Sequence, residues 1–374
     1  MGWVQLANLS HNIGIHMADE TTQQQTLAAF HPTNFGLVQR MDVPNPEEER
    51  AWVSQIAGIG PVAFTTLSWA HANGTTTWTD ADGHDHPVSF LELVSRLQGQ
   101  VWGMGDFDVL PPIGLAKVEE SGGCIGVAYR ADTGFNSAGW LGFVMGFGSP
   151  GGVLYSHMLA TNPTARNNNI GWLLKVMQAY HAVRLGHTVM RWTFDPMRGA
   201  NGMLNVVKLG GALDLYIVDY YGGWSNALYG RVPTDRYKVR WSLNDAGVHE
   251  RLRQIYSGTY QPTGLDEASA LPQATGATID ELTQTQPPRL AFAIPGDIDT
   301  LSSENPRYAL EKRAEMRAVL SRLLETRRPV YTDTHTFDPA RLGVEVTPGK
   351  YQVTDFVSAV VDGERRNYYV LTLK

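Results

Sequence analysis

Hydrophobic and polar positions along this chain follow two recurring patterns. Short runs of alternating or continuous apolar residues predict strands, at residues 75–79, 125–129, 140–147, 154–161, 188–194, 213–218 and 289–294. Apolar stripes at helical spacing, or residues typical of helix ends, predict helices at 46–56, 88–102, 170–185, 200–209 and 306–325. The order strand, helix, strand over residues 154–194 indicates a parallel crossover unit, because parallel strands need a connection of this kind.

Shifts in composition divide the chain into three predicted regions. Residues 1–73 form an N-terminal extension of unknown role, and residues 74–243 carry the clearest succession of strands and helices. Residues 244–374 form a C-terminal α/β region. Within it, residues 256–286 are rich in Thr, Gly, Pro and Gln and are interpreted as a linker or long loop. Two runs near the C-terminus, 351–361 and 367–373, predict a closing hairpin.

Composition excludes several classes of protein. The chain has 374 residues, of which 43% are hydrophobic and 18% charged, which is typical of a globular protein of two or three domains. A net charge of −7 argues against nucleic acid as the main partner, because phosphate binding favours a basic surface. No run of eighteen apolar residues predicts a membrane span. Cys124 is the single cysteine, so we expect no internal disulfide, a buried strand position for its thiol, and a cytoplasmic location.

One loop has the composition of an anion-binding site. Arg166, Asn167, Asn168 and Asn169 lead directly into the predicted helix that begins near Ile170. A helix N-terminus presents main-chain N–H groups and partial positive charge, which favour a bound phosphate. Successive amides point inward only where residues adopt left-handed backbone angles, and Asn does so more readily than other residues besides Gly. The segment therefore predicts an anion nest, with an ordinary Asn-rich helix start as the alternative.

The same loop carries a family resemblance. Arg166-x-x-Asn169-x-Gly171 resembles the Arg/Gln-x-x-Gly-x-Gly/Ala signature of GCN5-related N-acyltransferases (GNATs), with Asn169 in place of the first Gly. Over about residues 75–374 the chain resembles a bacterial subfamily of predicted acyltransferases, members of which are encoded beside N-acylamino acid (N-succinylamino acid) racemases. The segments that carry this resemblance are 101–103, 156–159, 192–196, 201–210, 220–222, 233–236, 294–295, 309–317 and 351–356.

The resemblance implies a fold and a co-substrate. The fold would be mixed α/β (α+β), with a mostly antiparallel sheet, a central parallel strand–helix–strand unit, flanking helices, an N-terminal extension and a C-terminal α/β arm. The co-substrate would be a coenzyme A thioester, acetyl-CoA or succinyl-CoA, with no metal. The residues implied in binding it are Met158, Leu159, Ala160, Arg166, Asn167, Asn168, Asn169, Ile170, Gly171, Asn201, Asn205 and Lys208. A homodimer is left open.

The resemblance identifies the catalytic groups less clearly than the residues that bind coenzyme A. In the reaction of this superfamily a neutral amine attacks the thioester, so the enzyme deprotonates the amine and protonates the leaving thiolate. His157 and Asp195 are the candidate bases, with Asp106 and Asp108 as remoter ones. Many members carry a helix Tyr as the acid.

In this chain Val206 aligns with that Tyr, which leaves Tyr220, Tyr221 or solvent as the source of the proton. Arg236 is the candidate contact for the carboxylate of an amino-acid acceptor, with an internal ion pair to Asp235 or a neighbour as the alternative.

Two other functions remain open at this level. The chain could be a non-catalytic acyl-CoA-binding or regulatory protein, which the substituted Gly and the absent Tyr would suit. The run Asp80-x-Asp82-Gly83-His84-Asp85-His86 could bind a metal, although its spacing misses the EF-hand pattern and a solvated turn is the favoured interpretation.

Overall fold

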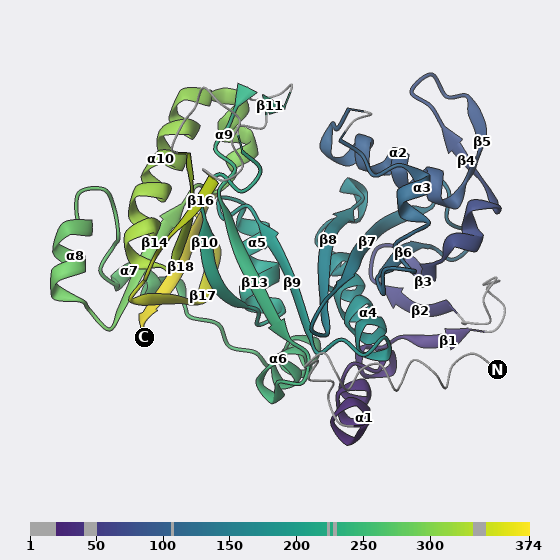
Figure 1. Cartoon of the computed structure of the whole chain (residues 1–374), viewed down its shortest axis with the longest axis horizontal. Coiled ribbons are helices and arrows are strands. Elements are labelled where there is room, and N and C mark those ends of the chain that lie inside the picture. The colour runs from purple at the N-terminus through teal and green to yellow at the C-terminus, as the bar shows by residue number, and fades with distance from the viewer. Residues whose placement is uncertain (1–19, 41–50, 106–107, 223–224, 227–229, 332–341) are drawn as a thin grey trace. The chain divides into compact units, whose positions relative to one another are not determined.

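The computed structural model describes residues 20–40, 51–105, 108–222, 225–226, 230–331 and 342–374 (Figure 1). The chain forms two compact units. Unit 1 comprises residues 1–191 and 242–256, and unit 2 comprises residues 192–241 and 257–374. The boundary between the units falls inside strand β9 (Val189–Phe194), which starts in unit 1 and ends in unit 2.

Unit 1 is built on a mostly antiparallel sheet. Its strands follow one another in space in the order β1 (Val38–Arg40), β2 (Ala51–Ile56), β3 (Gly60–Leu67), β6 (Cys124–Arg130), β7 (Trp140–Ser149) and β8 (Val153–Thr161). The start of β9 pairs with β8 in parallel, in register from Val153↔Val189 to Tyr155↔Arg191. Helix α4 (Ile170–Arg184) connects these two strands. The predicted mixed α/β class and its central parallel crossover unit are therefore confirmed.

Two helices cover opposite faces of this sheet, because successive residues of a strand point to opposite sides. On β7, Phe143 and Met145 belong to the core cluster that includes α2 (Phe90–Trp102). The intervening Gly142 and Gly146 face α4 instead. A Cβ on Gly142 would lie 2.9 Å from Leu174 Cδ1 and 2.7 Å from the main-chain oxygen of Ala160, so glycine is required for α4 to pack this closely.

Helix α2 shows how local sequence sets an element's ends. The Ser89 side chain accepts a hydrogen bond from the N–H of Glu92, and Gly103 ends the helix in a left-handed conformation. The prediction of a start at residue 88 was therefore early, because Val88 and Ser89 belong to strand β5 (Asp85–Ser89). Strands β4 (Thr75–Thr79) and β5 form a separate hairpin (Figure 1).

The N-terminal region contradicts two predictions. The predicted helix at 46–56 is wrong where the structure describes it, since Ala51–Ile56 is strand β2, paired with β1 and β3; residues 46–50 lie outside the described residues. Residues 20–67 also supply α1 (Glu20–Ala29) and η2 (Pro32–Phe35) to unit 1, so the extension continues the sheet of the region that follows it.

Unit 2 contains strands from distant parts of the sequence. Strand β10 (Ala212–Ile217) pairs antiparallel with β13 (Arg236–Ser242) and parallel with β15 (Thr326–Tyr331), which pairs antiparallel with β16 (Leu342–Thr347). A second sheet has the order β14 (Arg289–Ile294), β18 (Glu364–Leu373), β17 (Tyr351–Val361). The predicted C-terminal hairpin is confirmed as β17 and β18. The predicted linker at 256–286 is partly wrong, because it contains helices α7 (Leu265–Ala270) and α8 (Ile279–Thr285).

Helices complete both units. The predicted helix at 200–209 is α5 (Gly199–Gly202) followed by a π-helical turn, η5 (Met203–Lys208). The charged helix predicted at 306–325 is α10 (Pro306–Leu323), preceded by α9 (Ile298–Glu304). The remaining elements are η3 (Trp69–Ala72), α3 (Pro112–Leu115), η4 (Pro163–Ala165), α6 (Ala246–Ser257), β11 (Ser225–Asn226) and β12 (Gly230–Arg231).

Candidate functional site

Strand β8 pairs with β9 over only the first part of its length. Its register with β9 ends at Tyr155, whereas its register with β7 continues to Thr161. The pairing with β7 shifts between Met145↔Met158 and Gly146↔Ser156, so His157 is the extra residue of a β-bulge. Residues 156–161 thus form a strand segment beyond the β9 ladder, with a local kink at its start. This segment contains Met158, Leu159 and Ala160, the predicted main-chain contacts of the thioester.

His157, one of the two predicted bases, lies at this bulge. Its side chain is exposed, and its ring lies 5.8 Å from that of Phe147, centroid to centroid. Partial desolvation lowers the pKa of His157 below its ordinary value of 6.5. The imidazole is therefore neutral at pH 7 and can accept a proton.

Two of the three asparagines in the loop before α4 adopt the predicted left-handed conformation. Asn167 has φ 67° and Asn169 has φ 60°, both in the left-handed region. Asn169 immediately precedes the helix, and α4 begins with no side-chain cap and no acidic residue in its first turn. Arg166 and both of these asparagines are exposed. The loop therefore presents the positive end of a fifteen-residue helix together with an arginine to solvent.

A buried polar cluster that the sequence did not indicate lies beneath β8. Lys175, on α4, is 2% exposed and donates to Ser156 Oγ at 2.7 Å. That hydroxyl in turn donates to Gln178 Oε1 at 2.8 Å. Burial lowers the pKa of Lys175 well below its ordinary value, which favours a neutral amine. Cys124 is buried on β6 as predicted, and burial raises the pKa of its thiol to about 12, so it is unreactive.

In unit 2, Asp195 forms an ion pair. Its two carboxylate oxygens accept from the Arg313 guanidinium at 3.2 and 2.9 Å, and the N–H of Met197 donates to it at 2.9 Å. Burial would raise the pKa of Asp195, but the charge and hydrogen bonds of Arg313 hold it below its ordinary value. Because both oxygens are occupied, these contacts do not favour the general-base role, which stays a prediction.

Asp235 binds several donors at once. Its buried carboxylate accepts from Tyr216 Oη at 2.5 Å and from Arg317 Nε at 3.0 Å. Arg236 does not pair with that carboxylate; its guanidinium donates to the main-chain oxygen of Asp235 at 2.9 Å and lies over the ring of Tyr221, 5.2 Å from its centroid. The ion pair with Asp235, which the sequence suggested as an alternative role for Arg236, is formed by Arg317.

The other predicted residues of unit 2 have mixed surroundings. Tyr220 and Tyr221 are exposed, with ring centroids 4.8 Å apart. Asn205 is buried, and its Oδ1 accepts from Trp192 Nε1 at 2.9 Å, an interaction of the protein core. Asn201 and Lys208 are half-buried, and desolvation lowers the pKa of Lys208. Val206, aligned with the family's helix Tyr, is buried in η5.

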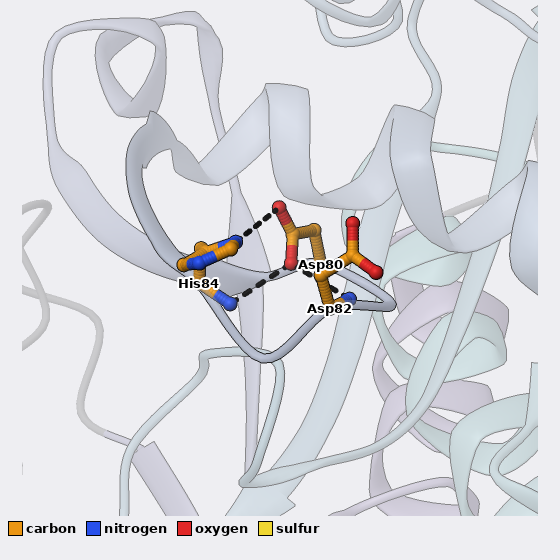
Figure 2. Close-up of side chains that lie close together, drawn as sticks. All are labelled: Asp80, Asp82 and His84. Atoms are coloured by element: carbon orange, nitrogen blue, oxygen red, sulfur yellow. Dashed lines mark hydrogen bonds and ion pairs between the residues drawn. The ribbon is translucent and has the colours of Figure 1, made fainter.

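The turn at residues 80–84 is closed by its own hydrogen bonds. Figure 2 shows Asp80, Asp82 and His84, whose potential ligand atoms lie within 4.8 Å of one another. The Asp80 carboxylate accepts from the N–H groups of Asp82 at 3.0 Å and His84 at 2.9 Å, and contacts His86 Nε2 at 2.8 Å. The hydrogen bond from His86, followed by that from His84, lowers the pKa of Asp80. These contacts suit a solvated turn between β4 and β5.

Comparison with known proteins gives limited similarity. No protein-family model matches the sequence, and no curated protein matches it. Similar solved structures include the ribosomal-protein-S18-alanine N-acetyltransferase from Escherichia coli (10% identity, 50% of this chain, 96% of that chain, TM-score 0.35). Another is an acetyltransferase of the GNAT family from Staphylococcus aureus Mu50 (9% identity, 48% of this chain, 99% of that chain, TM-score 0.32). A third is the IAA acetyltransferase from Bacillus cereus (11% identity, 48% of this chain, 99% of that chain, TM-score 0.32). At these identities and TM-scores, the similarity assigns no activity to the chain.

Among the described residues, no helix combines the length and the apolar character needed to cross a membrane.

Proposed function

We propose that this chain is an acyl-CoA-dependent N-acyltransferase of the GNAT type that acts on a small amine, with an amino acid as the favoured acceptor and acetyl or succinyl as the acyl group. The observation that carries the proposal is the joint geometry of β8 and α4. Strand β8 contains a β-bulge and continues past the last residue that pairs with β9. The loop after it contains two residues with left-handed backbone angles and leads into the exposed N-terminus of α4. The family resemblance of the segments listed above supports the same activity.

In this proposal unit 1 holds the co-substrate. The pyrophosphate of coenzyme A binds at the N-terminus of α4, where Arg166 adds a full positive charge. The thioester lies along residues 158–160 of β8, whose main-chain N–H groups stabilise the oxyanion that develops on the carbonyl. The amine nitrogen attacks that carbonyl carbon and the C–S bond breaks. The leaving thiolate takes up a proton from Tyr220, Tyr221 or solvent. His157, neutral at pH 7, takes the proton that the amine loses.

A second function, non-catalytic binding of acyl-CoA, is favoured by two observations. Val206 occupies the position of the family's acid, and Asp195 is held by Arg313. Release of free thiol from acetyl-CoA or succinyl-CoA in the presence of pooled amino acids distinguishes the two functions. We expect release that depends on the acceptor, and its absence alongside intact coenzyme A binding would assign the binding function. A cytoplasmic location and a homodimer stay predictions from the sequence.

Coenzyme A should raise the melting temperature of the protein through the loop before α4. A ligand at 100 times its dissociation constant adds about 2.7 kcal/mol to stability. Asn169→Pro should nearly abolish this shift, because proline fixes φ near −65° where the loop requires 60°. Asn169→Gly keeps the left-handed angle and should retain it. Arg166→Ala should weaken the shift by loss of charge.

The matched control is Arg184→Ala, which removes an arginine from the last turn of the same helix and should leave the shift unchanged. Equal coenzyme A affinity in the wild type, Asn169→Pro and Arg166→Ala would disprove the cradle.

If an amino acid is the acceptor, Arg236 is the candidate for holding its carboxylate. The guanidinium is half-buried and oriented by the Tyr221 ring and the Asp235 main-chain oxygen, which leaves its planar fork in a fixed position. Arg236→Lys should therefore raise the acceptor KM while the coenzyme A thioester KM stays the same. Steady-state kinetics with free amino acids and their amides test this. Amides accepted as well as free amino acids by the wild type would contradict it.

A further inference from the structure

A pocket of about 400 Å³ lies in unit 2 along one face of α10. The helix residues that line it recur at helical spacing i, i+3, i+4, i+7 and i+8, and are Ala314, Arg317, Ala318, Ser321 and Arg322. Small side chains in the middle of this face leave a hollow, and arginines border it. Pro233 and Arg328, on β15, form the rest of the lining. Its size falls within the range of small-molecule sites.

The three arginines of the pocket differ in how their charge is balanced. Arg317 pairs with both Asp235 and Asp219, and Arg322 pairs with Asp280. Arg328 is exposed, and its side chain makes neither a hydrogen bond nor an ion pair with another described residue. Its cross-strand neighbour is Glu345, which is also exposed. Among the described residues, Arg328 is therefore the arginine of this pocket that has no ion pair.

Ser321 is a second polar residue of the lining. Its hydroxyl is buried and has no hydrogen-bond partner among the described residues. A buried polar group without a partner is unfavourable, so a ligand that supplied an acceptor to this hydroxyl would stabilise the protein. The methyl groups of Ala314 and Ala318 and the ring of Pro233 offer an apolar surface beside it.

We propose that this pocket binds a small organic carboxylate with a short apolar chain and no positively charged group. Arg328 meets the carboxylate, Ser321 donates to one of its oxygens, and the apolar chain lies against Ala314, Ala318 and Pro233. A ligand with a cationic group is disfavoured, because Asp219, Asp235 and Asp280 are already engaged by arginines. The site is formed by unit 2 residues alone, and its test needs no acyl-CoA, so it does not depend on the proposed transferase activity.

The test is a ligand-observed NMR titration of the full chain with isovalerate, isovaleramide and valine at constant ionic strength. Isovaleramide has the same shape without charge, and valine is isovalerate with an added ammonium group. Isovalerate should bind with a dissociation constant roughly tenfold lower than either, since hydrogen bonds to charged groups are stronger than neutral ones. Equal affinity for isovalerate and isovaleramide would overturn the proposal. So would inorganic phosphate competing as well as isovalerate, which would indicate an unselective anion site.

Variants locate the binding. Arg328→Gln should raise the isovalerate dissociation constant roughly tenfold. Arg327→Gln is the matched control, because Arg327 is exposed on the same strand but points to its other face. Ala318→Leu should block binding by filling the hollow while leaving every charge in place. Glu345→Gln, which removes the competing carboxylate opposite Arg328, should tighten it. Equal effects of Arg327→Gln and Arg328→Gln, or normal binding by Ala318→Leu, would place the ligand elsewhere.

Discussion

Replacing Arg313 by alanine is expected to lower the free energy of unfolding by about 3–5 kcal/mol, the usual cost of removing one partner of a buried ion pair. Arg313 is 8% and Asp195 12% exposed, and the two groups share two hydrogen bonds. Without the guanidinium, the carboxylate would stay buried with the Met197 N–H, the charge of Arg236 and the more distant Arg198, 4.0 Å away. The loss of stability arises mainly from the unpaired buried charge of Asp195, and not only from the missing hydrogen bonds.

Urea unfolding at pH 7 measures this effect, with Arg198→Ala as the control. Arg198 is 48% exposed and pairs chiefly with Asp299, so its removal should cost less than about 1 kcal/mol. The folded state depresses the pKa of Asp195, so the ion pair stabilises above the unfolded value of 3.8 and this contribution is lost as pH falls through the folded value. Similar losses in Arg313→Ala and Arg198→Ala would contradict this account.

Lys175→Met should change how stability depends on pH. In the folded protein, burial depresses the pKa of this amine well below its ordinary value of 10.5. Between the folded and unfolded values the unfolded chain therefore binds one more proton, and stability rises with pH by about 1.4 kcal/mol per unit. Methionine removes the ionisable group. The variant should be more stable than the wild type near pH 7, by an amount that shrinks by about 1.4 kcal/mol per unit as pH rises.

The measurement compares unfolding free energies of the two proteins from pH 7 to pH 9. It stays below pH 9 because burial raises the pKa of Cys124 to about 12, which gives an opposite slope above its unfolded value of 9.0. Lys117→Met, at an exposed surface position, should give a difference that does not vary with pH. A constant difference for Lys175→Met would mean that Lys175 keeps its charge in the folded protein.

The features predicted best from the sequence are those that depend on a short stretch of the chain. The alternation of apolar residues located β6, β7 and β8, and the left-handed tendency of asparagine predicted the angles of Asn167 and Asn169. The bulge at His157 had no such signal, because it depends on the register that β8 adopts against β7. Arg313 and Asp195 are 118 positions apart, so no local pattern linked them. Strand β2 was misread because an acidic run outweighed the weaker alternation of Ala51–Ile56.

The buried cluster at Lys175 was missed for a different reason. The apolar stripe of α4 was correctly identified, yet a lysine next to that stripe is normally assigned to solvent, since lysine is almost never fully buried. Here Ser156 and Gln178 provide polar contacts within the core. Such a position becomes visible only when strand and helix are brought together, because its partners come from both.

The two interleaved units have a consequence for synthesis on the ribosome. The chain leaves unit 1 after Arg191 and returns for residues 242–256, where α6 lies, before it completes unit 2. Domains usually fold as wholes, in the order in which they emerge. Unit 1 therefore cannot be complete until residue 256 has left the exit tunnel. By then β10 and β13 have emerged, although β15, the parallel neighbour of β10, has yet to be translated. These exposed strand edges make the interval a natural point for a chaperone to bind the nascent chain.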